Sequence, residues 1–254
     1  MKIAIITGAS SGMGREFVRQ LCREDSFDQV WVIARRLDRL NELKAEMGDF
    51  IRPIALDLIK DESITQLKGL LEAEKPEVAV LVNASGFGKF EAFENIPLED
   101  QLQMIDLNAR SLTAVTYVTL PYLKAGSKVY QVASLSSFQP VPYIGVYGAT
   151  KAYVLSFTRA LGAELRHTGI KMMAVCPGWV KTEFFDRAVT NESVITYYNQ
   201  YFTAEEVVTR ARRDMKKGKD VSVCGWKIRA QVLLTKLLPH RLVMKIWLAQ
   251  QGKK

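Results

Sequence analysis

A tyrosine and a lysine four residues apart carry the clearest chemical signal in this sequence. Tyr147 and Lys151 fall in a long helical pattern, so both side chains leave the same face of the helix. A phenol has a pKa of about 10, and a nearby ammonium group favours the phenolate and should lower that pKa. Ser134, after the preceding apolar run, could hold a carbonyl oxygen while Tyr147 protonates it. Taken alone, the pair could equally be an ordinary amphipathic feature of a helix.

A glycine-rich turn near the start of the chain predicts a phosphate-binding loop. The apolar run 3–6 is followed by T-G-A-S-S-G-M-G at 7–14 and then by a helical pattern. Glycines permit a tight turn, backbone N–H groups can approach a pyrophosphate there, and the helix N-terminus adds positive partial charge. The spacing G-x-x-x-G-x-G departs from the commoner G-x-G-x-x-G. A glycine-rich turn without a ligand is the alternative.

Two arginines end the second predicted strand, residues 30–34. In a dinucleotide-binding fold this point faces the adenosine ribose, where an acid binds a free 2′-hydroxyl and an arginine accommodates a 2′-phosphate. Arg35 and Arg36 stand here, and the next acid, Asp38, lies near the start of the following helix. The sequence therefore favours NADP(H) over NAD(H), although the arginines could simply be solvated.

Apolar runs alternate with helical patterns along most of the chain. The predicted strands cover residues 3–6, 30–34, 52–56, 78–82, 129–133 and 170–176, with an edge strand at 221–223. The predicted helices between them include 38–47, 61–74, 99–122 and 147–167. This alternation predicts an α/β fold, with residues 1–254 as a single Rossmann-type domain. Its doubly wound parallel sheet has about seven strands and carries helices on both faces.

Composition limits the class of protein further. The chain has 254 residues, enough for one sizeable α/β core. Three cysteines without a C-x-x-C pattern argue against a disulfide framework, and two histidines are too few for a typical metal centre. Met1 leads straight into the first strand without a signal peptide, and no apolar run reaches the length of a membrane span. We expect a soluble, cytoplasmic protein without a metal site.

The net charge of +8 is concentrated in the last 74 residues, which hold 15 Lys+Arg and 7 Asp+Glu. The extension 225–254 mixes apolar residues with basic ones, contains no acid, and is divided by Pro239 into two short helical patterns. No nucleic-acid-binding signature accompanies these charges, so we expect no nucleic-acid partner. The extension could pack on the sheet edge or on a second subunit. It could also contact anionic lipid at a membrane surface, or cap a lipid-like substrate.

Six motifs in order resemble the short-chain dehydrogenase/reductase family over most of the chain. They are T-G-A-S-S-G-M-G at 7–14, Asp57, N-A-S-G at 83–86, Asn108, Ser134 with Y-G-A-T-K at 147–151, and P-G-W-V-K-T at 177–182. Ser85 departs from the family's usual glycine or alanine, and a small hydroxyl should be tolerated there.

The resemblance implies a catalytic set. Tyr147 would be the acid/base, Ser134 would fix the substrate oxygen, and Lys151 would lower the pKa of the tyrosine and bind the nicotinamide ribose. Asn108 would distort its helix and hold a water that relays protons to Lys151. Ser136 competes for the serine role, and the family interval of thirteen residues to the tyrosine selects Ser134.

The resemblance also implies a set of coenzyme contacts along the phosphates, the adenosine and the nicotinamide. These are Gly8, Ser10, Ser11, Gly12, Met13, Gly14, Arg35, Arg36, Asp57, Leu58, Asn83, Ala84, Tyr147, Lys151, Pro177, Gly178, Val180 and Thr182. The implied activity is NADPH-dependent transfer of a hydride between nicotinamide and a carbonyl/secondary alcohol substrate. A homodimer or homotetramer that pairs through the helices carrying Asn108 and Tyr147 is the family's common assembly.

The segment 183–220 is expected to form a substrate lid and the helix that follows it. Its first part is rich in aromatic residues: Phe184, Phe185, Tyr197, Tyr198, Tyr201 and Phe202. They suggest a bulky or apolar substrate, or they pack the lid on the body. Two other functions stay open, an NADP(H)-binding regulatory protein without turnover and a membrane-surface interaction protein. The complete catalytic set argues against the first, because a sensor has no need of an acid.

Overall fold

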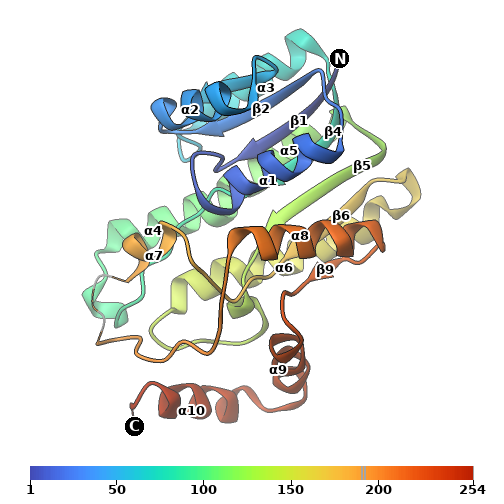
Figure 1. Ribbon diagram of the computed structural model, residues 1–254. Helices are drawn as coiled ribbons and strands as arrows, with labels where there is room; N and C mark the ends of the chain where they lie inside the picture. The colour runs from blue at the N-terminus through green and yellow to red at the C-terminus, as the bar shows by residue number, and fades with distance from the viewer. Residues whose placement is uncertain (190, 192, 254) are drawn as a thin grey trace.

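A parallel sheet of seven strands runs through the molecule (Figure 1). In the computed structural model, which describes residues 1–189, 191 and 193–253, the strand order is β3-β2-β1-β4-β5-β6-β9. The strands are β1 (Lys2–Thr7), β2 (Gln29–Ala34), β3 (Ile51–Ala55), β4 (Glu77–Asn83), β5 (Leu123–Val132), β6 (Lys171–Val175) and β9 (Val221–Ser222). The chain order reverses between β1 and β4, the switch point at which doubly wound sheets bind ligands. The predicted fold class is confirmed.

Helices cover both faces of this sheet. Successive residues of β1 enter different clusters: Ala4 and Ile6 pack with helices α1 and α8, whereas Ile3 and Ile5 pack with α3 and α5. The helices of the sheet layers are α1 (Gly12–Glu24), α2 (Leu37–Met47), α3 (Asp61–Glu74), α4 (Leu98–Ile105), α5 (Leu112–Thr119), α6 (Gly145–Glu164) and α8 (Ala204–Lys216). Because strand side chains alternate between faces, each face carries an apolar layer.

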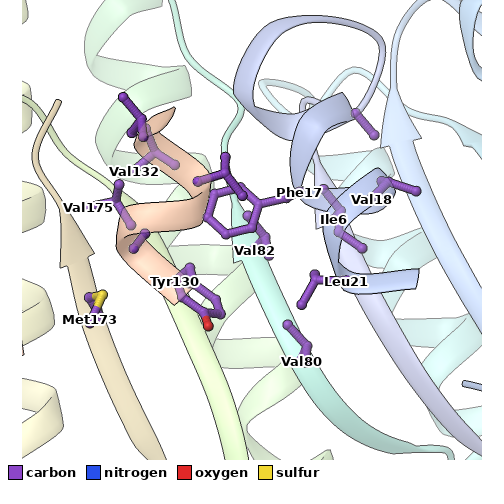
Figure 2. Close-up of a cluster of buried hydrophobic side chains, with 14 of the residues drawn as sticks. Ile6, Phe17, Val18, Leu21, Val80, Val82, Tyr130, Val132, Met173 and Val175 are labelled. Carbon is purple, nitrogen blue, oxygen red and sulfur yellow. The ribbon is translucent and has the colours of Figure 1, made fainter. Parts of the chain in front are cut away.

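Helix α1 of the first βα unit is held on the sheet by packing between two aromatic side chains. Phe17 of α1 points towards the sheet and lies close to Tyr130 of β5, with ring centroids 5.0 Å apart (Figure 2). Leu21 lies one turn further along the same helix and is buried in the same cluster. This packing fixes α1, and therefore the glycine-rich turn at its N-terminus.

The predicted helix 99–122 is not a continuous α-helix: it is distorted around Asn108, the residue that the family resemblance expected to distort it. The segment forms α4, then a π-helical turn over Asp106–Ser111, then α5. Ser111 donates from Oγ to the carbonyls of Leu58 and Asp106, at 2.6 and 2.7 Å. Single π-helical turns often mark functional positions, and this one contains Asn108.

Strand β5 begins six residues earlier than predicted. Residues 124–128 are polar or small, so no apolar pattern shows there. The structure nevertheless pairs Leu123 with Val78, across a register shift. Ser127 stabilises the shift by donating from Oγ to the Val78 carbonyl at 2.7 Å, and it accepts from the Lys124 N–H at 2.9 Å.

The extension beyond β9 forms two helices that lie apart from the sheet layers (Figure 1). They are α9 (Trp226–Leu237) and α10 (His240–Gln250), which Leu238 and Pro239 separate as the sequence predicts. Residues 190 and 192 of the predicted lid, and the last basic residue, Lys254, lie outside the described residues. Among the residues that are described, no helix is long and apolar enough to cross a membrane.

Candidate active site

A cavity of about 480 Å³ opens at the carboxyl ends of the central strands. Its walls come from the glycine-rich loop, the ends of β2, β4, β5 and β6, the start of α6, the lid segment and the C-terminal extension. All predicted coenzyme contacts except Asn83 line it. Asn83 lies behind the wall, where its Nδ2 donates to Thr116 Oγ1 at 3.1 Å, so its contribution is to support the loop after β4.

The predicted tyrosine, lysine and serine meet on one wall of the cavity. Tyr147 and Lys151 project from the first turns of α6, and the Lys151 Nζ lies 5.7 Å from the centroid of the Tyr147 ring. The Lys151 Nζ donates to the carbonyl of Val132, at the end of β5, at 2.8 Å. The Ser134 side chain lies close enough to the Tyr147 hydroxyl to act on the pKa of the phenol. The arrangement can place a proton donor and a second hydroxyl on one substrate oxygen.

The hydrogen bonds of the neighbouring serines separate the two candidates for the serine role. Ser134 caps a short 3₁₀ turn, accepting from the Ser136 N–H at 3.2 Å. Ser137 is engaged elsewhere, because its Oγ donates to the Lys151 carbonyl at 2.7 Å. Ser136 Oγ is buried at the cavity wall without a hydrogen-bond partner among the described residues. Ser134 is therefore the serine in contact with the tyrosine, and Ser136 leaves a free polar group for a ligand.

The expected lowering of the tyrosine pKa is wrong for this structure. Burial raises the pKa of Tyr147 to about 12, and the Ser134 side chain opposes this only in part. Burial likewise lowers the pKa of Lys151 to about 8. Loss of hydration penalises the charged form of each group, and at this separation the amine does not reverse the effect on the phenol. The four-residue spacing predicted that Tyr147 and Lys151 are close together. It could not show that both side chains are buried.

Asn108 uses its whole side chain to join three elements behind this wall. Its Oδ1 accepts from the Phe87 N–H at 3.0 Å, and its Nδ2 donates to the Phe87 carbonyl at 2.9 Å and to Thr150 Oγ1 at 3.1 Å. A Cβ on Gly86 would lie 2.8 Å from the Asn108 Oδ1 and 3.3 Å from the Lys151 Nζ. Asn108 thus fixes the loop after β4 against α6, next to the lysine. Its predicted role in a water relay remains a prediction.

The glycine-rich loop has the shape that a dinucleotide phosphate requires. A Cβ on Gly14 would lie 2.3 Å from the Gly8 carbonyl oxygen, so only glycine allows this turn to close. Gly8 has a φ of +68°, and a Cβ there would lie 2.7 Å from the Ala84 carbonyl group. The first turn of α1 carries no acid, so its positive end faces the cavity uncompensated. The loop therefore fits a pyrophosphate.

The adenosine end of the cavity contains an acidic residue, Glu183, that was not among the predicted coenzyme contacts. Arg35, Arg36, Asp57 and Leu58 line it as predicted. Arg36 donates from Nη2 to Ser10 Oγ at 3.2 Å and to Glu183 Oε2 at 2.9 Å. Glu183 is 147 positions away in the chain, so no local pattern could have revealed the pair.

Aromatic residues form the substrate end. Phe90 and Phe184 both pack on the Tyr147 ring, with centroids 5.5 Å from it. Phe185 and Tyr197 of the lid also line the cavity. The other lid aromatics pack instead: Tyr198 lies edge-on to Trp179, Tyr201 stacks on Tyr198, and Phe202 is buried in the main core. Some of the lid aromatics therefore line the cavity, and the others pack the lid segment on the body of the protein.

The C-terminal extension forms part of the cavity wall at this end. No sequence motif predicted this contact. Trp247 of α10 lines the cavity beside Trp179, and its Nε1 donates to the Pro142 carbonyl at 3.1 Å. Gln251 is buried, and its Oε1 accepts from the N–H groups of Thr196 and Tyr197 at 2.8 and 3.0 Å. The extension therefore contacts the predicted lid segment and forms part of the cavity wall.

Comparisons with known proteins agree with this geometry. Residues 2–193 match the short chain dehydrogenase family. The NADP-dependent 3-hydroxy acid dehydrogenase YdfG of Escherichia coli O6:H1 is 31% identical over 216 residues, covering 82% of this chain and 86% of that protein. Sulfoacetaldehyde reductase 2 of Chromohalobacter salexigens is 34% identical over 188 residues, covering 72% of this chain and 74% of that protein.

A solved structure shares both the fold and part of the sequence. A short-chain dehydrogenase from Sphingobium yanoikuyae in complex with NADPH is 25% identical, with a TM-score of 0.77 over 88% of this chain and 87% of that one. The matched range 2–193 contains the glycine-rich loop, the tyrosine–lysine pair and the start of the lid, but not the extension. The chain belongs to the short chain dehydrogenase family and is an oxidoreductase that uses a nicotinamide coenzyme.

Proposed function

We propose that this protein is an NADPH-dependent reductase of a bulky or apolar carbonyl compound, or the dehydrogenase of the corresponding secondary alcohol. The observation that carries the proposal is the meeting of Tyr147, Ser134 and Lys151 on one cavity wall, with the glycine-rich loop lining the same cavity. The alternative of a regulatory protein without turnover has no support. An acid and its positioning groups have no use in a sensor.

The chain's own residues would organise the proton transfer. A nicotinamide coenzyme bound along the glycine-rich loop would supply or accept the hydride. Ser134 would hold the substrate oxygen, and Tyr147 would donate to it, because its raised pKa keeps the phenol protonated at neutral pH. Lys151 is fixed by the Val132 carbonyl beside the tyrosine ring, and it would bind the ribose of a bound coenzyme. The predicted water relay from Asn108 would resupply the proton.

The substrate class follows from the aromatic walls beside Tyr147. Phe90, Phe184 and Trp179 surround the position of a carbonyl held by Ser134 and Tyr147, and Trp247 closes the far side. Aromatic walls favour apolar or aromatic groups on the carbonyl carbon. A panel of aryl ketones, steroids, sugars and 3-oxoacyl thioesters, followed by NADPH consumption, tests the proposal. Turnover of sugars alone would refute the apolar class, and no turnover of any carbonyl would refute the reductase.

The preference for NADP(H) is supported by Arg35 and Arg36 at the end of β2. The names of two similar proteins point the same way, one an NADP-dependent dehydrogenase and one solved with NADPH. A charged hydrogen bond contributes about 1.5–3 kcal/mol, so NADPH should exceed NADH at least about tenfold in kcat/KM. Arg35→Asp should reverse this ratio. Equal use of both coenzymes by the wild type would refute the preference.

A homodimer is supported by exposed apolar residues on the helices that the sequence indicated. Leu98 and Leu102 of α4, Tyr117 of α5 and Tyr153 of α6 are all exposed, Tyr117 by 76%. Tyr153 is linked to α5 through Thr113 Oγ1 at 2.8 Å, so the exposed residues of α5 and α6 lie side by side. Light scattering should give twice the chain mass or more for the wild type and the monomer mass for Leu102→Asp/Tyr117→Asp. A monomeric wild type would refute it.

Contact with an anionic membrane surface is supported by the outer face of α9 and α10. Leu233, Leu234 and Leu237 are exposed, Leu237 by 75%, among basic residues and without an acid from 225 onward. Binding to phosphatidylglycerol vesicles should weaken between low and physiological salt, because screening shortens the reach of exposed charges to about 8–10 Å. Flotation with vesicles at both salt concentrations measures this. Leu234→Ser/Leu237→Ser should reduce binding, and no flotation at low salt would refute the contact.

A cytoplasmic location is supported by the cysteines. Cys22, Cys176 and Cys224 are free thiols, and Cys176 is buried beside the catalytic wall. Free thiols persist in reducing compartments. Fractionation of cells producing the protein tests the location.

A further inference from the structure

A carboxylate lies in the part of the cavity where a coenzyme phosphate would need positive charge. Glu183 is the first residue after Thr182, and its Oε2 lies 2.9 Å from the Arg36 Nη2. The same nitrogen also donates to Ser10 Oγ at 3.2 Å. Arg36 lowers the pKa of Glu183, and a hydrogen bond from Ser11 contributes in the same direction. Glu183 is therefore an ionised carboxylate paired with Arg36 and Ser11, and Arg36 in turn also donates to the Ser10 hydroxyl.

These partners are the donors that a 2′-phosphate would use. An arginine after the second strand and hydroxyls on the glycine-rich loop can all donate to phosphate oxygens, and charge-assisted hydrogen bonds are the stronger kind. We propose that Glu183 is a coenzyme-selectivity residue, whose carboxylate occupies Arg36 and competes there with the 2′-phosphate of NADP(H) but not with NAD(H). This inference rests on the proposed NADP(H) site.

The position of Glu183 in the lid gives the competition a structural consequence. Thr182 packs on the glycine-rich loop, with its Cγ2 3.3 Å from where a Cβ on Gly12 would lie. Glu183 is followed by Phe184 and Phe185, which line the substrate end of the cavity. A phosphate that takes Arg36 from Glu183 therefore releases one of the contacts between the start of the lid and the nucleotide half of the cavity.

The strength of the Arg36–Glu183 ion pair determines how much the affinity for NADPH should change when Glu183 loses its charge. The side chains of Arg36 and Glu183 are 43% and 48% exposed. Exposed ion pairs contribute up to about 1 kcal/mol, which corresponds to about fivefold in affinity. Removing the charge of Glu183 should thus tighten NADPH binding about two- to fivefold.

Calorimetric titration of Glu183→Gln and wild type with NADPH and with NADH tests the inference. The dissociation constant for NADPH should fall about two- to fivefold, and that for NADH should stay the same or rise. Adenosine 2′,5′-bisphosphate should repeat the NADPH result and adenosine 5′-monophosphate the NADH result, because they differ only in the 2′-phosphate. An unchanged NADPH constant, or an equal shift for both coenzymes, would overturn the inference.

Two further variants separate competition for Arg36 from a general loss of negative charge. Glu42→Gln is the matched control, because Glu42 pairs with Arg15 and Arg39 but does not line the cavity. Glu42→Gln should leave the dissociation constant for NADPH unchanged. In an Arg36→Ala background, Glu183→Gln should lose its effect, and a retained effect would contradict the competition. Weak NADPH binding by the wild type would instead refute the NADP(H) proposal itself.

Discussion

In the nucleotide half of the cavity the glycine-rich loop and the two arginines directly follow strands, with Glu183 of the lid as the exception, whereas the substrate half joins segments that are distant in the chain. The glycine-rich loop follows β1 and runs beside the loop after β4, where Thr7 Oγ1 accepts from the N–H groups of Ala84 and Ser85 at 3.1 and 3.2 Å. The substrate half depends on side chains such as Gln251, which reaches back 55 positions to Thr196. Backbone geometry fixes the first half, and side-chain contacts fix the second.

This difference implies that the two halves can be damaged separately. A change in the loops after β1 and β4 should affect coenzyme binding and folding together, because the sheet supports both. A change in the extension, or in the lid beyond Glu183, should affect substrate use and leave the coenzyme dissociation constant unchanged. Four variants test this separation.

Tyr147→Phe should have the largest effect and should leave the nucleotide half intact. It removes only the hydroxyl beside Ser134, and loss of a catalytic acid costs about 10²–10⁴-fold in rate. Steady-state kinetics should show this loss in kcat, while titration shows an unchanged coenzyme constant. A variant with more than about a tenth of the wild-type kcat would exclude Tyr147 as the acid.

Gly14→Ala should disrupt the nucleotide half. The added methyl would lie 2.3 Å from the Gly8 carbonyl oxygen, so the turn has to open. Overpacking of this kind costs about 1–3 kcal/mol of unfolding free energy, and coenzyme affinity should fall at least about tenfold because the phosphate loop moves.

Gly69→Ala is the matched control for that variant. Gly69 lies inside α3, and a Cβ there would meet no atom of the described chain within 4 Å. The control should raise the unfolding free energy by about 0.5–1 kcal/mol and leave coenzyme binding unchanged. Chemical denaturation measures both variants. Normal coenzyme affinity in Gly14→Ala would contradict the proposed phosphate loop.

Gln251→Leu should damage the substrate half alone. It leaves the N–H groups of Thr196 and Tyr197 without their acceptor, at a local cost of about 1–3 kcal/mol. The KM for a carbonyl substrate should rise about five- to tenfold, with kcat and the coenzyme constant less affected. Leu237→Ser, on the exposed face of the same extension, should change neither constant. If the dissociation constant of the coenzyme rose as much as the KM, the two halves of the cavity would not be separable.

Lys151→Met should raise the stability of the protein at neutral pH, with a distinctive pH dependence. The pKa of Lys151 is lowered to about 8, so burying its charge at neutral pH costs stability that the variant recovers. After allowance for the lost hydrogen bond to the Val132 carbonyl, the free energy of unfolding of the variant should exceed that of the wild type by about 1–2 kcal/mol at pH 7. Between pH 8 and the ordinary lysine pKa the unfolded chain binds more protons, so the wild type gains stability and the difference shrinks. A constant difference across this range would contradict the buried ammonium.

The contrast between the halves also explains what the sequence could predict. The glycine-rich turn, Arg35 and the tyrosine–lysine pair are local patterns, and each lies where its strand or helix ends. Trp247, Gln251 and Glu183 carry no local pattern, because each acts through a partner chosen only by the tertiary fold. The pKa of Tyr147 was predicted in the wrong direction for a related reason. Burial depends on neighbours that spacing does not reveal.

The bond between Gln251 and Thr196 has a consequence for synthesis on the ribosome. Translation proceeds at about 5–20 residues per second, so Gln251 follows the loop after β4 by roughly 10–30 s. During that interval the segment around Thr196 lacks the hydrogen bonds that Gln251 supplies. The order of synthesis thus makes the closing of this end of the cavity a late event, which follows the formation of the sheet.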